Sequence, residues 1–400
     1  MTTSLATSRL KSATDRGTYT YIAVYSAVLY MTLLIAPIIA AKLVSQFGLT
    51  STEVGGLLSL ELGAFSLATV PAYLWLRRIN LVTATRVFTL VAVAGNVASG
   101  FVDSYGLLVA CRIITSLAAG SITVIILTLS SKTDNPSRAY GLFVTAQLVM
   151  GAIILAVFPA VFANANVSAV YWTMAGLALC CLLFAGRIDG NALRAGSKTA
   201  HPETASARGA RVPKLKAGLG LAAVLLFYVS LSGVWSFMAQ IAGGANIDLS
   251  TTSLILALAT VPGIASSMLA TVLGDHPKRA LFLILGYVGL TASVVLLFGL
   301  SGTIQFALAA IIFKFTWTFI LPYLLSSISD LDASGQLMNT TNLMIGTGFA
   351  VGPLLGGILI QATGGFTAML AVACVGTLAS MLCAVGIQRR ASRELASPAI

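Results

Sequence analysis

Long runs of apolar residues, separated by short polar loops, follow one another along the whole chain. Each run is about 20 residues or longer, the length of an α-helix that crosses the hydrocarbon core of a membrane. We therefore expect an all-α membrane protein with twelve transmembrane helices. In the first half these are Tyr19–Gln46, Thr52–Leu76, Leu81–Val102, Tyr105–Ser131, Arg138–Ala163 and Ser168–Gly186; in the second half they are Ala217–Gly243, Ser250–Leu273, Arg279–Leu300, Thr303–Ser329, Ser334–Gln361 and Gly365–Gln388.

A basic segment separates the sixth expected helix from the seventh. Residues 187–216 hold seven Lys and Arg residues among Gly, Ser, Ala and Pro, with too few apolar side chains to form a core. This composition predicts a linker that lies on the anionic inner leaflet, although a plain flexible tether fits it equally well. The expected organisation is thus a six-helix bundle over 1–186, the linker over 187–216 and a second, pseudo-symmetric six-helix bundle over 217–400.

Charged residues are few and unevenly distributed. They make up 9% of the chain, against roughly 25% in a soluble domain. Of the 23 Lys and Arg residues, 20 lie on one side of the expected membrane, in the loops and terminal segments. Lys42 lies on the other side, and Arg112 and Lys314 lie inside apolar runs. Because such residues concentrate in cytoplasmic loops, we expect a multi-pass protein of the bacterial inner membrane with both termini in the cytoplasm. The formal charge of +11 then reflects topology, and not a basic face for nucleic acid.

Three short motifs lie in or beside these helices. Residues 273–279 read Leu-Gly-Asp-His-Pro-Lys-Arg, Arg112 is followed by Ser116 and Gly120, and residues 348–357 read Gly-Phe-Ala-Val-Gly-Pro-Leu-Leu-Gly-Gly. Together with the two six-helix halves, these motifs resemble those of the major facilitator superfamily, over essentially the whole chain.

This resemblance implies roles for four residues in gating. Asp275 and Arg279 would lock neighbouring helices at the cytoplasmic side, and Gly352 and Pro353 would form part of a structural gate. The corresponding first-half loop, residues 75–80, keeps its arginines but lacks the aspartate, which puts a charge lock there in doubt. The glycine–proline motif lies in the eleventh helix, whereas drug antiporters carry it in their fifth. This difference argues mildly against a drug antiporter.

Three ionisable residues lie deep inside expected helices: Glu61 in the second, Arg112 in the fourth and Lys314 in the tenth. They lie roughly nine, seven and eleven residues from the outer helix ends, so their depths agree within about 6 Å. Two cations and one carboxylate leave about one positive charge uncompensated, which costs about 2.5–3.5 kcal/mol at a helix centre. An anionic substrate would reduce that cost. We therefore hypothesise an organic-anion site in a central cavity, with Lys314 as a point-charge clamp and Arg112 as a bidentate partner.

Each of these residues also has a structural interpretation. Glu61 and Arg112 could form an ion pair between helices. Lys314 could donate to backbone or hydroxyl oxygens, or it could lose its proton when removed from water and so serve in proton coupling. Glu61 is the only deep carboxylate, which makes it the first candidate for the proton-coupling residue.

Aromatic and amide side chains supply weaker candidates for the substrate site. Trp317 lies three residues after Lys314 and shares its helix face. Such residues are more often packing or interface residues than ligands, but together they would suit a carboxylate attached to an aromatic or apolar body. Besides Trp317, the candidates are Tyr30, Tyr228, Gln147 and Asn342.

Other classes of function lack their characteristic residues in this sequence. There is no Gly-x-x-x-x-Gly-Lys-Ser/Thr phosphate loop, and the only histidines are His201 and His276. We expect neither an enzyme nor a bound cofactor or metal. We predict a monomeric secondary transporter that moves a small organic anion, a carboxylate, across the lipid bilayer by alternating access in symport with protons. The alternatives are a proton-coupled exporter of drugs or amphiphiles and, less favoured, a membrane sensor that binds its ligand without transport.

Overall fold

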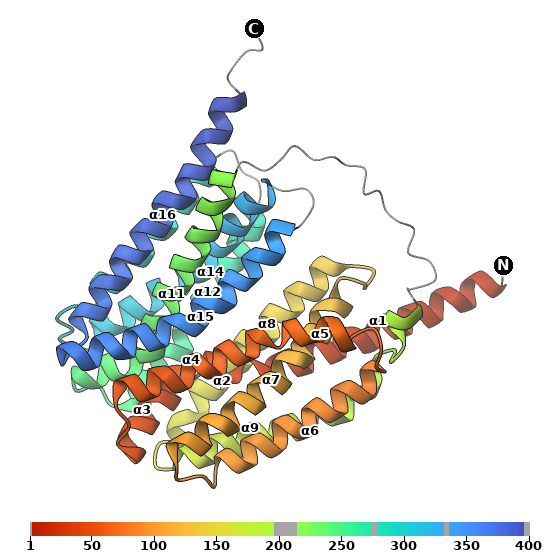
Figure 1. Cartoon of the computed structure of the whole chain (residues 1–400), viewed down its shortest axis with the longest axis horizontal. Helices are drawn as coiled ribbons and strands as arrows, with labels where there is room; N and C mark the ends of the chain where they lie inside the picture. The colour runs from red at the N-terminus through yellow and green to blue at the C-terminus, as the bar shows by residue number, and fades with distance from the viewer. Residues whose placement is uncertain (1, 196–213, 274–277, 332–335, 396–400) are drawn as a thin grey trace. The chain divides into compact units, whose positions relative to one another are not determined.

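The computed structural model of the chain describes residues 2–195, 214–273, 278–331 and 336–395 (Figure 1). Every regular element in these ranges is helical, so the all-α prediction is confirmed. In the first half the helices are α1 Thr2–Leu29, α2 Met31–Leu34, α3 Ala36–Phe47, α4 Ser51–Leu67, α5 Thr69–Trp75, α6 Leu81–Ser99, α7 Tyr105–Ser130, α8 Pro136–Val161, α9 Val167–Cys181, η1 Leu182–Arg187 and α10 Ala192–Ala195. In the second half they are α11 Lys214–Gly244, α12 Leu249–Leu273, α13 Arg279–Val295, α14 Thr303–Ser329, α15 Gln336–Thr363 and α16 Thr367–Leu395.

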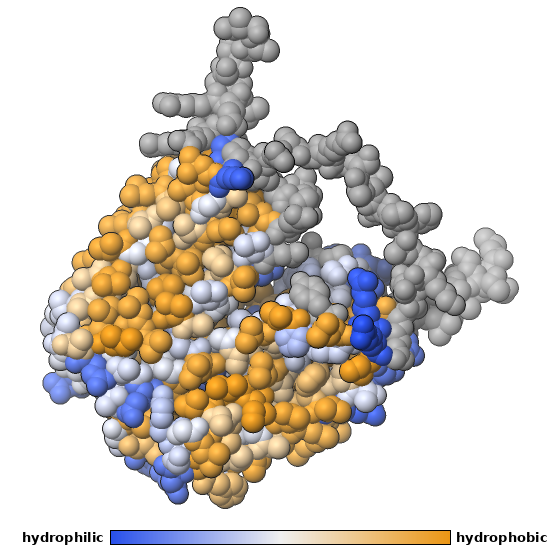
Figure 2. Space-filling model, viewed as in Figure 1, coloured by the Kyte–Doolittle hydropathy of each residue, from blue (hydrophilic) through white to orange (hydrophobic). Residues whose placement is uncertain are grey.

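These helices account for the expected transmembrane segments. Within the described residues, ten helices are long and apolar enough to cross a membrane, and Ala36–Phe47 and Arg279–Val295 are two shorter apolar helices. Apolar side chains cover much of the surface seen in Figure 2, and large ones such as Phe101, Leu258 and Leu382 are exposed. Such a surface would favour aggregation in water, whereas in a bilayer it is the surface that lipid covers. The prediction of a multi-pass membrane protein is confirmed.

Two of the expected helices are divided into shorter α-helices. The first is divided into α1, α2 and α3, and the second into α4 and α5. Proline explains the break between α2 and α3 and the break between α4 and α5, because its ring clashes with the carbonyl group four residues earlier and it has no N–H to donate. The break between α1 and α2, at Tyr30, has no proline beside it. Pro37 lies in the first turn of α3 and Pro71 in the first turn of α5. The helices continue through Pro159, Pro262, Pro322 and Pro353.

The helices group into two compact units. The first unit comprises Met1–Ile39, Leu60–Ile154 and Asn164–Ala205, and the second comprises Ala40–Ser59, Leu155–Ala163 and Ser206–Ile400. In the first unit, α6 packs against α7 and α9, and α1 packs against α7. In the second unit, α11 packs against α15 and α16, while α12 and α13 pack against α14. The expected division into 1–186, 187–216 and 217–400 stays a prediction.

Many hydroxyl groups inside the spans are satisfied by their own helix. Thr89, Ser130, Thr316 and Thr341 each donate to the carbonyl oxygen four residues earlier, at 2.6–2.9 Å. Such bonds let a hydroxyl group enter the membrane without a partner on another helix. Charged side chains have no such local solution, so they mark the places where a second helix, or a ligand, must supply a partner.

Candidate functional site

Lys314 lies near the middle of α14 and is buried in the second unit, with 2% of its surface exposed. Its ammonium nitrogen lies over two indole rings, 3.6 Å from the centroid of Trp235 and 4.4 Å from the centroid of Trp317. Trp317 is about one helical turn further along α14, whereas Trp235 belongs to α11. Helical spacing alone therefore predicts the contact with Trp317, and the packing of α11 on α14 supplies the contact with Trp235.

Two indole rings contact this ammonium, and Phe313 packs against both of them; we refer to Trp235, Phe313 and Trp317 as the aromatic cluster. The rings of Trp235 and Phe313 are nearly parallel, with centroids 6.4 Å apart and planes at 11°. Trp317 meets Trp235 edge to face at 5.9 Å and Phe313 at 6.2 Å. Mutual packing restrains the rings and thereby positions the ammonium between them. Phe313 was not predicted as a site residue, because one more aromatic residue in an apolar run carries no distinctive signal.

No carboxylate neutralises Lys314 among the described residues, where its ammonium makes neither an ion pair nor a hydrogen bond. In the second unit the acidic residues with described side chains, Glu53, Asp248 and Asp330, lie at helix ends. A desolvated cation–π contact contributes about 2 kcal/mol, whereas burying an ion costs several kcal/mol. The two indoles therefore offset only part of that cost, and a bound anion would offset more.

The hydroxyl groups nearest to Lys314 along α14 are already engaged. Thr318 donates to the carbonyl oxygen of Gly263 at 2.7 Å and shares a hydrogen bond with the hydroxyl of Ser266. Thr316 donates to a carbonyl oxygen of its own helix at 2.7 Å. The backbone of α12 at Gly263 lies against that of α14, where a Cβ atom would be 3.4 Å from the carbonyl oxygen of Lys314, an ordinary van der Waals contact. The site thus presents one positive charge and three aromatic rings, with the hydroxyls of Thr316 and Thr318 held by other partners.

Arg112 and Glu61 form a buried ion pair in the first unit, with 1% and 2% of their side chains exposed. Arg112 Nε donates to Glu61 Oε1 at 2.9 Å, and Nη2 donates to the same oxygen. Nη1 donates to Asn96 Oδ1 at 2.7 Å, and the guanidinium carbon lies 4.8 Å from the ring centroid of Tyr171. These side chains come from α7, α4, α6 and α9, so four helices meet at one guanidinium. The ion pair that the sequence left open as a structural interpretation is present.

The guanidinium of Arg112 has little capacity left for a further ligand. All three of its nitrogens donate within the first unit, and Thr32 lies 3.4 Å from Nη2. The hydroxyl of Tyr171 is buried and has no hydrogen-bond partner among the described residues. Roles for Arg112 in substrate binding and for Glu61 in proton coupling stay predictions. Asn96 and Tyr171 were not predicted, because nothing in the sequence distinguishes them from other polar and aromatic residues in the spans.

The remaining predicted substrate residues lie in other surroundings. In the first unit, Tyr30 packs edge to face against two phenylalanine rings, and Gln147 donates to a carbonyl oxygen of its own helix at 3.3 Å. In the second unit, Tyr228 is buried against a phenylalanine ring of α15, and Asn342 is exposed. Their part in substrate binding stays a prediction, whereas Trp317 contacts the Lys314 ammonium directly.

The predicted charge lock of the second unit involves a residue outside the motif. Arg279 Nη1 lies 2.6 Å from Asp330 Oδ2, which ties the start of α13 to the end of α14. Both side chains are partly exposed, at 32% and 50%. Asp275 lies outside the described residues, so the locking role of Asp275 and Arg279 stays a prediction. Asp330 is the partner that the sequence did not identify.

We expect the Arg279–Asp330 pair to contribute little stability. Arg279→Gln should lower the free energy of unfolding by less than about 1 kcal/mol, since partly exposed pairs are screened by water and salt. Thermal unfolding of the purified Arg279→Gln and Asp330→Asn variants, in low and in high salt, measures this effect. A loss of about 3 kcal/mol that salt does not change would be the behaviour of a buried pair and would contradict the expectation.

Gly352, predicted with Pro353 as a gate residue, lies where α15 packs on α11. A Cβ atom on Gly352 would collide with the hydroxyl of Ser232 and the carbonyl oxygen of Val229. Ser232 also donates to the carbonyl oxygen of Gly348 at 3.0 Å. Small residues thus let the two helices approach closely, while the gating role of Gly352 and Pro353 stays a prediction.

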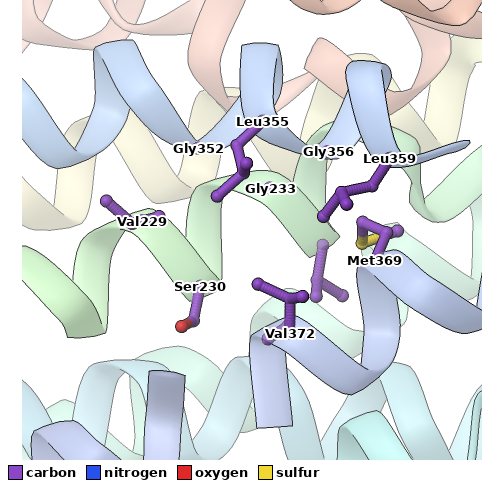
Figure 3. Close-up of a pocket in the computed structure, with 11 residues that line it drawn as sticks. Val229, Ser230, Gly233, Gly352, Leu355, Gly356, Leu359, Met369 and Val372 are labelled. Atoms are coloured by element: carbon purple, nitrogen blue, oxygen red, sulfur yellow. The ribbon is translucent and has the colours of Figure 1, made fainter. Parts of the chain in front are cut away.

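A groove between α11, α15 and α16 lies beside this contact (Figure 3). It is shallow, open on one side and lined by apolar side chains such as Leu355, Leu359 and Met369, together with glycines. Ser230 supplies the only polar side chain among the described residues that line it, and none of them is charged. The groove offers nothing to neutralise an ion, so we place the functional site at Lys314 instead.

The apolar spans define a polytopic helical membrane protein whose buried ionisable residues mark candidate functional positions. The sequence profile of the Major Facilitator Superfamily matches residues 21–338. The chain therefore belongs to this superfamily, which confirms the resemblance seen in its motifs, and it is a transporter and not an enzyme.

Solved structures with a similar fold are also transporters. The nucleoside transporter NupG aligns with a TM-score of 0.69 and 12% identity, over 95% of this chain and 98% of its own. A D-xylose-proton symporter aligns with a TM-score of 0.67 and 12% identity, over 94% and 96%. A bacterial homolog to the human lysosomal transporter Spinster, in an inward-facing and unoccupied conformation, aligns with a TM-score of 0.61 and 14% identity, over 94% of each chain. No curated protein matches the sequence. At these identities the likeness shows the shared fold.

Proposed function

We propose that this transporter moves a small organic anion together with a proton by alternating access. The observation that carries the proposal is the ammonium of Lys314. It is buried in a membrane-spanning helix, and among the described residues it has aromatic contacts but no carboxylate partner. A charge kept in the membrane is costly and usually functional. A carboxylate ligand would supply the missing negative charge.

The chemistry of the ammonium suits this role. It is a compact point charge with three N–H donors. The two indole faces engage at most two of these donors, which leaves a direction from which a ligand can accept a hydrogen bond. Charge-assisted hydrogen bonds to a carboxylate are roughly twice as strong as neutral ones. A carboxylate could therefore compete successfully with the indole rings for the ammonium.

Glu61 is the proposed proton-coupling residue. It is the only buried carboxylate among the described residues, and its charge balances that of Arg112. Protonation of Glu61 would remove this balance and leave the guanidinium with Asn96 as its main acceptor. Proton binding would thereby be linked to the packing of the four helices that meet at Arg112. We propose that the protein does this as a monomer in the bacterial inner membrane, with both termini in the cytoplasm.

Export of cationic drugs or amphiphiles fits this geometry less well. A cation placed beside Lys314 would meet a like charge in a region of low dielectric constant. The apolar groove of Figure 3 is too poor in polar groups to orient such a molecule. The fold is that of a transporter, so it does not by itself favour a membrane sensor that binds its ligand without transport.

Ligand-dependent thermal stabilisation of the purified full-length chain tests the proposal. Carboxylates should raise the Tm and cationic amphiphiles should not, since binding to the folded state stabilises it by about 2.7 kcal/mol at 100 times the Kd. In proteoliposomes, an imposed pH gradient, acid outside, should accelerate uptake of the stabilising carboxylate. Stabilisation by cations alone would contradict the anion site, and uptake that ignores the pH gradient would contradict proton coupling.

A further inference from the structure

The surroundings of Lys314 restrict the anion further than its charge alone does. We infer that the substrate is an aromatic monocarboxylate, whose carboxylate binds the Lys314 ammonium and whose ring packs against Trp235 and Trp317. This inference rests on the proposed function, because it describes the body of the anion proposed there. It is carried by the charges, the rings and the hydroxyl groups around one nitrogen atom.

The charge of the ligand follows from the cations available. Of the other cations of the second unit with described side chains, Lys214, Lys216 and Arg279 lie in the first turns of their helices, and Lys278 is exposed just before α13. The remaining one, Lys42 of α3, is buried, lies over the ring of Phe158 and donates to the carbonyl oxygen of Ala163. In the first unit, Arg112 is already neutralised by Glu61. One ammonium balances one carboxylate, and a second carboxylate buried beside it would have no partner. The site is therefore suited to a monoanion.

The aromatic cluster determines the body of the ligand. Because the indole faces lie 3.6 Å and 4.4 Å from the Lys314 nitrogen, a group attached directly to a carboxylate at this nitrogen comes within reach of the same rings. The cluster already uses edge-to-face contacts, with planes at 68° between Trp235 and Trp317 and at 79° between Phe313 and Trp317. An aromatic ligand presents its positive edge to such faces, whereas a saturated ring of similar size cannot.

The engaged hydroxyl groups argue against a polar body. Thr318 is held by Gly263 and Ser266, and Thr316 is held by its own helix. The protons of both threonine hydroxyls are thus committed, so neither can donate to a ring oxygen or hydroxyl of a sugar or nucleoside, and polar groups left unpaired on burial weaken binding. The solved structures of similar fold include a nucleoside transporter and a xylose symporter, so this point separates the chain from proteins that share its fold.

Calorimetric titration of the purified full-length chain with four probes tests the inference. Benzoate should bind about three- to tenfold more tightly than cyclohexanecarboxylate, the ratio expected for one added ring–ring contact. Benzamide, which lacks the charge, and phthalate, which carries a second carboxylate, should both bind more weakly than benzoate. Trp235→Leu should remove the preference for benzoate while cyclohexanecarboxylate still binds, which also shows that the variant is folded. Trp235→Phe, which keeps a ring, should retain the preference.

Trp172→Leu is the matched control. Trp172 packs on Phe101 in the first unit, with ring centroids 5.0 Å apart, so its loss should leave the affinity ratio unchanged. Equal affinities for benzoate and cyclohexanecarboxylate, both lost in Lys314→Met, would overturn the aromatic assignment and leave the anion transporter intact. Tighter binding of phthalate than of benzoate would overturn the assignment of a single charge. Failure of all carboxylates to bind, with no difference in Lys314→Met, would overturn the inference and the proposed function together.

Discussion

Lys314→Met is expected to lower the affinity for carboxylates at least about 30-fold. Removing one partner of a buried charge pair costs about 2–5 kcal/mol, and each 1.4 kcal/mol is a factor of ten in Kd. Methionine keeps the unbranched shape of the side chain and can still pack on Trp235 and Trp317. The substitution therefore removes the charge and little else. Titration calorimetry on the purified protein and uptake into proteoliposomes measure the loss.

Lys42→Met controls for the removal of any buried lysine from the second unit. Lys42 is 3% exposed, its ammonium lies 5.3 Å from the ring centroid of Phe158, and it donates to the carbonyl oxygen of Ala163 at 3.4 Å. This substitution should change carboxylate affinity by less than about threefold, or 0.7 kcal/mol. Equal losses of carboxylate affinity in Lys42→Met and Lys314→Met would mean that removing any buried lysine weakens binding. An unchanged affinity in Lys314→Met would rule out Lys314 as the residue that binds the carboxylate.

The same Lys314→Met substitution should leave the ligand-free protein at least as stable as before. A buried ion that lacks a charged partner gains little from its surroundings, and apolar replacements of buried ionic groups are often neutral or stabilising by about 1–4 kcal/mol. Thermal unfolding without ligand gives the sign. If Lys314 lowers the stability of the ligand-free protein and raises the affinity for ligand, its role is functional. A large loss of stability in Lys314→Met would instead indicate a structural role.

Arg112→Met is expected to have the opposite effect on stability. It leaves the carboxylate of Glu61 buried without its cation, and breaking a buried pair by removing one partner costs about 3–5 kcal/mol. Glu61→Gln should cost a similar amount, because it leaves the buried guanidinium without a counter-charge. Thermal unfolding of the two variants beside the wild-type protein measures both losses.

The double variant separates the structural role of this pair from proton coupling. Glu61→Gln combined with Arg112→Met removes both charges and should recover most of the lost stability, since replacing a whole buried pair is often close to neutral. It should nevertheless take up carboxylate without responding to a pH gradient. A double variant with wild-type pH-driven uptake would show that Glu61 does not carry the proton, and one that stays as unstable as the single variants would show that the ion pair is not the cause.

Much of the site could be predicted because charges stand out in an apolar sequence. Glu61, Arg112 and Lys314 were identified in this way, and Trp317 followed from helical spacing after Lys314. The other members of the site, Phe313 beside Lys314 and Asn96 and Tyr171 beside Arg112, could not be found from the sequence. Their residue types are common in membrane helices, and only their positions relative to a charge make them distinctive.

The length and composition of the apolar runs by themselves determined the membrane class and the expected spans, because the transfer of a helix into lipid depends mainly on its own residues. The motifs determined the superfamily for a similar reason, since they are local in the chain. Only the tertiary structure decided that the two buried cations differ. Arg112 meets Glu61, whereas Lys314 meets the rings of Trp235 and Trp317. Which helix faces come together depends on packing along their whole length, and no short stretch of sequence contains that information.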